Sequence, residues 1–118
     1  MGFQGQSIVD NVHVNAILVF CTCPDEASAE RIAGALVEEH LAACVNRIPG
    51  IDSTYRWQGK VCRDSEQLLL IKTTRERFEA LRERIVALHP YELPEVIAVD
   101  IALGSAAYLE WIAAASRV

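Results

Sequence analysis

The spacing of apolar positions along the chain predicts alternating strands and helices. Apolar runs with β-branched side chains are typical of strands, and apolar residues repeated every three or four positions indicate helices. The first strand signal is apolar at consecutive positions, as in a strand buried on both faces. We expect strands at residues 14–23, 41–57, 61–72 and 95–103, helices at residues 24–40 and 73–88, and a short C-terminal helix that Ser105 caps.

Local signals refine these elements. Pro24 is suited to the first helical position, Pro49 and Gly50 indicate a bulge or bend within their strand, and residues 58–60 indicate a tight turn. Thr73, with Glu76 three residues later, has the pattern of a capping box. The second and third strands are therefore expected to form a long hairpin, and Thr73 to begin the second helix.

The order of elements is β-α-β-β-α-β with a trailing helix. This order predicts an α+β, ferredoxin-like sandwich in which a four-stranded antiparallel sheet carries both helices on one face. The first and third strands are nevertheless apolar on both sides, which leaves one apolar face without a cover from the chain itself. Further copies of the same chain are the simplest cover, so a homo-oligomer is expected.

Length, composition and charge narrow the class of protein. With 118 residues, 52% of them hydrophobic, the chain is expected to form one domain over residues 14–118 behind a disordered tail at residues 1–13. The net charge of −5 disfavours nucleic acid as a partner. The longest apolar run, residues 16–21, is too short to cross a membrane, and the first 13 residues lack the features of a secretion signal. A cytoplasmic protein with free thiols is expected.

Two short segments carry groups capable of chemistry. His89, Tyr91 and Glu95 lie in a stretch stiffened by two prolines, and Cys21 and Cys23 share one face of the first strand. Both segments also allow an ordinary structural interpretation: a histidine stabilising a helix C-terminus, and buried thiols in a core. The thiolate, imidazole and carboxylate groups of these segments are also ligand types that can hold copper or zinc.

The hairpin carries aromatic and basic side chains. Trp57 and Tyr55 near its tip suit either a subunit interface or a stacking platform for a ligand. Arg56, Lys60 and Arg63 surround them, and such a basic patch in an acidic protein can attract a small anion.

Several motifs together resemble the CutA family of divalent-cation tolerance proteins. The motifs are C-T-C-P-D-E at 21–26, L-A-A-C-V-N at 41–46, Y-R-W-Q-G-K at 55–60, K-T-T at 72–74 and H-P-Y-E-L-P-E at 89–95. The resemblance spans roughly residues 14–113. It implies a ferredoxin-like subunit in a tight homotrimer similar to PII signalling proteins, with a role in tolerance of copper and other divalent metals.

The resemblance also implies a set of copper ligands. The positions used by the family fall on Cys21, Leu88 and Glu95 here, and Leu88 cannot ligate a metal. The metal ligands expected are therefore Cys21 and Glu95, with the adjacent His89 as a third. Residues expected at a ligand cleft or interface are Cys23, which can supply a second thiolate, Tyr55, Trp57, Lys72 and Tyr91.

These observations lead to two hypotheses of function. The first is a homotrimeric divalent-cation tolerance protein that binds copper or other divalent ions, with Cu(I) favoured by the soft thiolate. The alternative is a PII-like regulatory trimer that binds a small anion or a protein partner at clefts between subunits. An enzyme is not expected, because no nucleophile, base and oxyanion-binding group can be assigned together.

Overall fold

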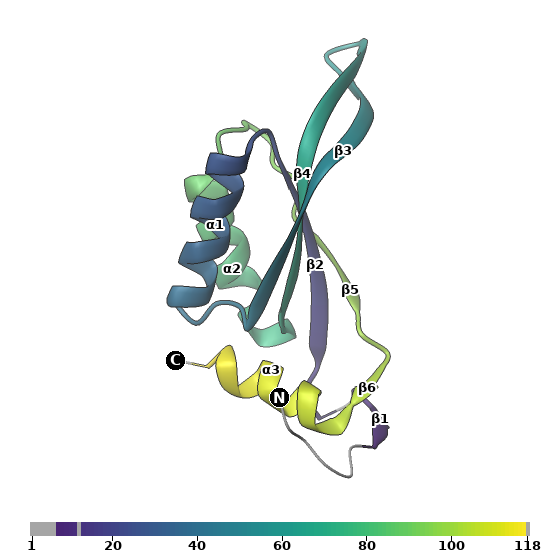
Figure 1. The fold of residues 1–118 in the computed structure, drawn as a ribbon, viewed down its shortest axis with the longest axis vertical. Coiled ribbons are helices and arrows are strands. Elements are labelled where there is room, and N and C mark those ends of the chain that lie inside the picture. The colour runs from purple at the N-terminus through teal and green to yellow at the C-terminus, as the bar shows by residue number, and fades with distance from the viewer. Residues whose placement is uncertain (1–6, 12, 118) are drawn as a thin grey trace.

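The computed structural model describes residues 7–11 and 13–117 and places two helices on one face of a four-stranded antiparallel sheet (Figure 1). The strand order β3-β4-β2-β5 is the ferredoxin-like arrangement predicted from the pattern, which is thereby confirmed. The elements are β1 (Ile8–Asp10), β2 (Ala16–Cys23), α1 (Glu26–Glu38), β3 (Cys44–Trp57), β4 (Lys60–Thr74), a 3₁₀ turn (Arg75–Arg77), α2 (Phe78–Leu88), β5 (Ile97–Asp100), β6 (Leu103–Ser105) and α3 (Ala106–Ala115).

The main core lies between the sheet and the helix pair α1 and α2. Alternate residues of β2 and β4 point toward the helices, and the helices present residues at the spacing of one face. Fully buried members of this core include Val19, Cys21, Leu69 and Ile71 from the sheet and Ile32, Leu36, Leu81 and Ile85 from the helices.

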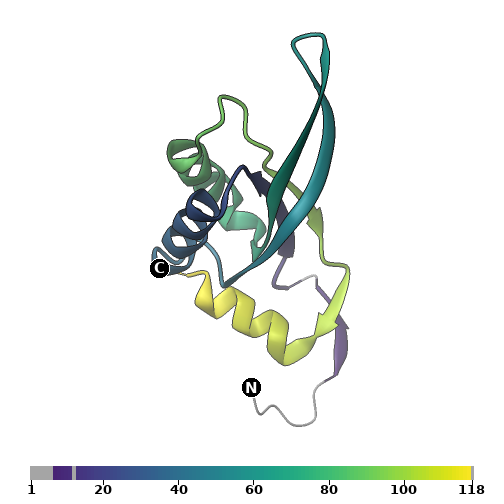
Figure 2. The same cartoon turned by 45° about the horizontal axis from the view of Figure 1, so that its top comes forward.

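The opposite face of the sheet has no helix over it (Figure 2). The residues of β2 that point to this side, Leu18 and Phe20, are only half-buried, and they pair with Val99 and Ile97 of β5. Val99 is 52% exposed and Ile97 is 59% exposed. The expected uncovered apolar face is therefore present in the single chain.

The hairpin of β3 and β4 extends well beyond the helices, in a molecule that measures 51 × 25 × 23 Å (Figure 1). We call its outer part, residues 51–66, the arm. Gln58 and Gly59 both have positive φ, as a two-residue turn between twisted strands requires. The register shifts between Ile48 and Ile51, where the bulge was expected. The turn and the bulge are both confirmed.

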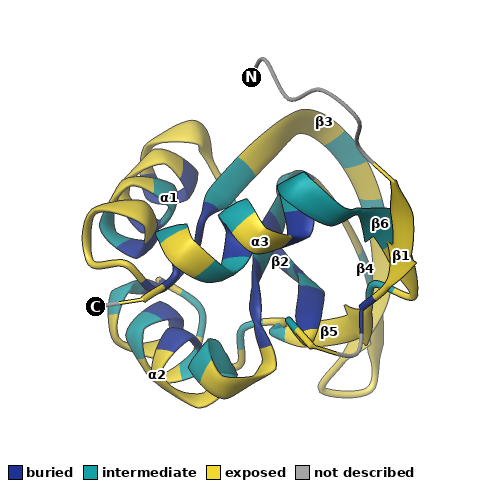
Figure 3. Ribbon diagram, turned by 90° about the horizontal axis from the view of Figure 1, so that it is seen from below, coloured by how far each residue is buried: buried dark blue, intermediate teal, exposed yellow. Residues whose placement is uncertain are grey.

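The C-terminal helix closes one end of the sheet. Viewed from that end, α3 lies across it (Figure 3). Leu109 and Ile112 bury against Ala16 and Ala43 in a second, smaller cluster. The tail expected at residues 1–13 lies partly outside the described residues, but Ile8–Asp10 is a strand that pairs with β6.

Three of the predicted boundaries were wrong. Helix α1 begins after Asp25, whose carboxylate accepts a hydrogen bond from the Ser28 N–H at 2.8 Å, so Pro24 precedes the cap. Thr73 does not cap α2: it is the last residue but one of β4, and α2 follows Arg77. The strand expected at 95–103 is divided into β5 and β6.

The buried Thr73 hydroxyl has a tertiary role instead. It donates a 2.7 Å hydrogen bond to the carbonyl oxygen of Leu41, and Thr73 is fully buried. This bond fixes the chain between α1 and β3 against the end of β4. An unsatisfied buried carbonyl costs about 1–3 kcal/mol.

Thr73→Val should therefore lower the free energy of unfolding by about 1–3 kcal/mol, because valine keeps the shape and removes the donor. Thr54→Val, at an exposed position of β3, is the control and should change it by less than about 0.5 kcal/mol. Denaturant unfolding at one fixed protein concentration measures both. Equal effects of the two substitutions would show that the Leu41 bond contributes nothing.

Candidate functional site

The alternation of side chains along β2 places two thiols on the side of the sheet that the helices cover. Cys21 and Cys23 point toward the helices and are fully buried, whereas Thr22 between them points to the opposite face. Both cysteines are free thiols. The single strand therefore presents a buried dithiol on one side and a polar residue on the other.

His89 joins this dithiol from the end of α2. Its backbone is extended because Pro90 follows, and this ends the helix and turns the ring toward β2. Nε2 lies 2.7 Å from the carbonyl oxygen of Thr22, and the Tyr91 N–H donates to Nδ1 at 3.0 Å. Since Nδ1 accepts a hydrogen bond, the ring proton is assigned to Nε2, which donates to Thr22.

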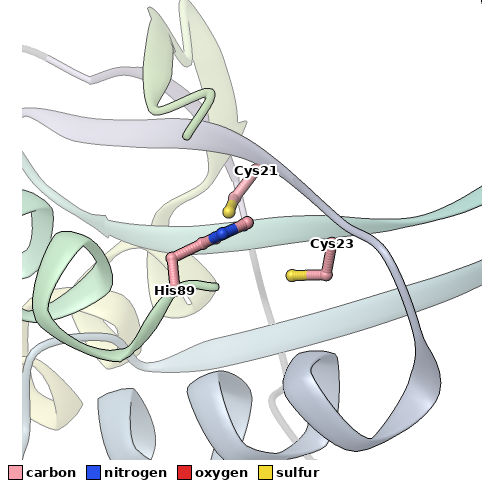
Figure 4. Close-up of side chains that lie close together, drawn as sticks. All are labelled: Cys21, Cys23 and His89. Atoms are coloured by element: carbon pink, nitrogen blue, oxygen red, sulfur yellow. The ribbon is translucent and has the colours of Figure 1, made fainter. Parts of the chain in front are cut away.

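The ligand atoms of Cys21, Cys23 and His89 lie within 4.8 Å of one another, and all three residues are buried (Figure 4). Two of the three predicted metal ligands, Cys21 and His89, are thus brought together, and Cys23 joins them. Both ring nitrogens of His89 are already engaged in hydrogen bonds. The thiols are the donors that remain for a metal, and the imidazole holds the Tyr91 segment against β2.

The two thiols influence each other's protonation. The side-chain interaction with Cys23, followed by burial and by the charges of Cys23, Glu95 and Glu66, raises the pKa of Cys21. The same interaction lowers the pKa of Cys23. Cys21 therefore keeps its proton, and its Sγ donates to the carbonyl oxygen of Thr22 at 3.8 Å. A metal must displace that proton to bind both sulfurs.

This donor set suits a soft metal ion. Thiolates favour ions such as Cu(I), whereas Mg²⁺ and Ca²⁺ require several oxygen ligands. A closed tetrahedral zinc site needs four donors, and no group larger than these three occurs among the described residues. The residues present fit a thiophilic ion held by two sulfurs.

Glu95, the other predicted ligand, is exposed and lies outside this group. It lines a cleft of about 740 Å³ at the base of the arm, on the side of β2 to which Thr22 points. Tyr55, Trp57 and Tyr91, which were expected at a cleft or interface, line it too. The thiols and the cleft thus lie on opposite sides of the same strand.

Two phenol–carboxylate pairs stand at this cleft. The Tyr91 hydroxyl donates to Glu66 at 2.6 Å, and burial followed by this bond raises the pKa of Tyr91. The Tyr55 hydroxyl donates to Asp64, which raises the pKa of Tyr55 to about 12. Glu66 is only 6% exposed. Its place at the cleft was not predicted. A glutamate that alternates with Leu68 and Leu70 on one apolar face of a strand was nevertheless a detectable signal.

Basic residues are absent from the cleft lining within the described part of the chain. In the arm, Thr54 pairs with Arg63 and Trp57 with Lys60, so strand alternation places Arg56 and Arg63 on the face opposite Trp57. Lys72, another expected cleft residue, lies elsewhere on β4 and donates to Asn46 at 2.6 Å. Of the three basic arm residues expected around the aromatic pair, only Lys60 shares the face of Trp57, and it does not line the cleft.

Comparison with known proteins identifies close relatives. A family model described as "CutA1 divalent ion tolerance protein" matches residues 17–115. A Thermus thermophilus protein named "Divalent-cation tolerance protein CutA" is 56% identical over 95 residues, which is 80% of this chain and 92% of that protein. The rice protein "Protein CutA 1, chloroplastic" is 47% identical over 88% of this chain, which spans only 59% of the rice protein's length.

Solved structures agree with these matches. The structure of the Thermus thermophilus divalent cation tolerance protein has a TM-score of 0.85 and 52% identity, covering 86% of this chain and 99% of that one. The structure of CutA from Xylella fastidiosa also has a TM-score of 0.85, with 50% identity, and covers 87% and 99% of the two chains. The ferredoxin-like fold is therefore shared along nearly the whole length of these two solved structures.

The hydrogen bonds of His89 predict its tautomer. Long-range ¹H–¹⁵N spectra should show His89 with the proton on Nε2 and a bare Nδ1, because Nδ1 accepts the Tyr91 N–H. The chain has three histidines, and His89→Gln identifies the signal by its loss. A proton on Nδ1 would mean that the imidazole does not hold the Tyr91 segment as described.

Proposed function

The chain belongs to the family of CutA1 divalent ion tolerance proteins, and from this premise we propose that it acts in metal tolerance by binding copper as a homotrimer. The observation that carries the metal proposal is the buried pair Cys21 and Cys23, whose sulfur atoms lie within 4.8 Å of each other and of a His89 nitrogen. Other thiophilic ions can use the same donors.

The environment of the pair supports Cu(I) over harder ions. Two sulfurs in an apolar core provide soft donors and exclude water. The negative charges of Glu66 and Glu95 already act on Cys21 from the cleft side, so they also favour a cation at the thiols. In this proposal His89 is a positioning residue, and Glu95 acts through its charge.

The trimer proposal rests on the uncovered face of the sheet. Leu18, Phe20, Leu68 and Leu70 form its centre, and Ile97 and Val99 on β5 are more than half exposed. A contiguous apolar face of this kind is typical of a subunit interface. Three copies packed around a common axis would remove it from water.

The proposed role is binding and assembly without catalysis. A cytoplasmic location is part of the proposal, and the four free cysteines support a reducing compartment. Among the described residues, no helix is long and apolar enough to span a membrane.

Copper retention should depend on both thiols. Cys21→Ser and Cys23→Ser should each weaken Cu(I) binding at least about tenfold, because a hydroxyl is a poor ligand for a soft ion. Titration of the reduced protein against a competing Cu(I) chelator measures the affinity. The matched control is Cys62→Ser, which removes a half-buried thiol of the arm and should change nothing.

The same titration separates the roles of the neighbouring groups. Glu95→Gln should weaken binding less than Cys23→Ser, because the carboxylate contributes charge from outside the donor group. An unchanged affinity in both cysteine variants, or an equal loss in Cys62→Ser, would refute the dithiol site.

Trimer formation can be tested with two matched valines. Light scattering should give about three times 13.1 kDa for the native protein. Val99→Glu puts a charge on the uncovered face and should reduce the mass toward one subunit. Val86→Glu, on α2 at 46% exposure against 52% for Val99, should leave the trimer intact. A native mass of 13.1 kDa would contradict the proposal.

A further inference from the structure

The dithiol of β2 has a redox property that follows from its place on a strand. Of the four free cysteines, Cys21 and Cys23 are fully buried. They are separated by one residue and point to the same face of β2 (Figure 4). Two thiols this close in sequence have two states to choose from, a pair that holds a metal ion and a disulfide bond. The geometry of the strand favours the first state and excludes the second.

The distance between the two Cβ atoms excludes the disulfide. Each residue of a strand advances the chain by about 3.3 Å, so residues two apart are separated by about 6.6 Å. The two Cα–Cβ bonds are parallel, because both side chains project from one face, so the Cβ atoms are also about 6.6 Å apart. A disulfide needs Cβ atoms about 3.5–4.5 Å apart. An S–S bond between Cys21 and Cys23 therefore requires β2 to leave its extended conformation.

The same spacing suits a metal ion that bridges the two sulfurs. The Sγ atoms of Cys21 and Cys23 lie within 4.8 Å of each other. A metal–thiolate bond is about 2.3 Å long, as in zinc sites, so an ion on the line between two sulfurs spans about 4.6 Å. The side chains can therefore hold an ion without a change of the backbone. This step rests on the proposed function, in which the pair binds Cu(I).

Three features keep β2 extended at this point. Thr22, between the cysteines, pairs with Leu68 in an unbroken register with β4. Its carbonyl oxygen also lies 2.7 Å from Nε2 of His89. Pro24 follows Cys23 directly and restricts that residue to extended backbone. The residue between the thiols and the second thiol itself are thus both fixed, so a disulfide could form only if this end of the sheet came apart.

The other two cysteines cannot serve as partners for the pair. Strand pairing puts Cys44 of β3 on the opposite face of the sheet. Cys62 lies in the arm, five residues before Gln67, which is the β4 residue that pairs with β2 beside the thiols. That separation is about 17 Å along the strand. Within the described part of the chain, no third thiol can therefore oxidise Cys21 or Cys23 by exchange.

We propose that the dithiol is held in its reduced form: β2 lets Cys21 and Cys23 share an ion and prevents them from forming a disulfide. Metal binding at this site is then insensitive to thiol oxidants that would inactivate a flexible pair of cysteines. The metal leaves by exchange with a competing ligand, and disulfide formation does not release it.

Oxidation by glutathione disulfide tests this proposal on the full-length protein. The step to be detected transfers two electrons and two protons from the pair to glutathione disulfide, which gives one protein disulfide and two molecules of glutathione. Cys44→Ser combined with Cys62→Ser leaves only the pair. In the folded protein, both thiols should still react with iodoacetamide after removal of the oxidant and denaturation, and Cu(I) affinity should be unchanged.

The same chain treated in guanidinium chloride is the positive control. It should form the disulfide and lose the mass of two hydrogen atoms, because the unfolded backbone is free to bend. Peptide mapping of the wild-type protein gives the same information if the double variant fails to fold.

A refolding experiment separates the geometry of the strand from burial. The pair is cross-linked in the unfolded chain, and the denaturant is then removed at one fixed protein concentration. The folding equilibrium constant of the cross-linked chain should be at least about a hundredfold lower than that of the reduced chain, because the strand cannot accommodate the bond without strain. Cys23→Ser in the same background has one thiol, and oxidant treatment should leave its folding unchanged.

Two results would overturn the proposal. One is a disulfide, within the pair or with glutathione, that forms in the folded protein as readily as in the unfolded chain. The other is a cross-linked chain that folds as stably as the reduced chain, since burial alone would then protect the thiols. If the reduced protein binds no Cu(I), the proposed function fails, and the oxidation and refolding results still decide whether the pair is held reduced.

Discussion

The structure depends on one constraint: the sheet has two apolar faces and the chain has helices for only one of them. The central strand β2 carries this division residue by residue. Val19, Cys21 and Cys23 are sealed under α1 and α2, and Leu18, Phe20 and Thr22 point to the face that the chain leaves uncovered. Because strand alternation is fixed, a residue cannot change sides without shifting the whole register. The division between a sealed dithiol and an accessible face is therefore built into eight consecutive residues.

His89 connects the two sides of this strand. Its ring donates to the backbone of Thr22 and accepts from the backbone of Tyr91, so the segment after α2 is attached to β2 at the point where the thiols lie. Tyr91 then reaches across to Glu66 of β4. A continuous chain of hydrogen bonds thus runs from the wall of the core to the base of the arm. A change at the thiols that displaced His89 would therefore also displace Tyr91 and its hydrogen bond to Glu66 at the cleft.

The repeating features of the fold could be predicted from the sequence, and the tertiary contacts could not. Strand alternation and helical spacing are local, so the sheet, the arm and its turn at Gln58 and Gly59 followed from the pattern. Thr73 matched a capping box, but its hydroxyl instead bonds Leu41, 32 residues away. The pairing of Tyr91 with Glu66 likewise joins residues 25 positions apart. No local pattern encodes such a contact, which is why Glu66 was missed although Tyr91 was anticipated.

The two candidate sites differ in what they can recognise, and the difference follows from how each is built. The dithiol is buried and offers two polarisable sulfur atoms, so it selects metal ions by their affinity for sulfur and does not select by molecular shape. The cleft is open and lined by dispersed carboxylates and rings, so it discriminates by charge and size and lacks a point of coordination. Negative charge is common to both, since Glu66 and Glu95 line the cleft and act on Cys21 through the strand.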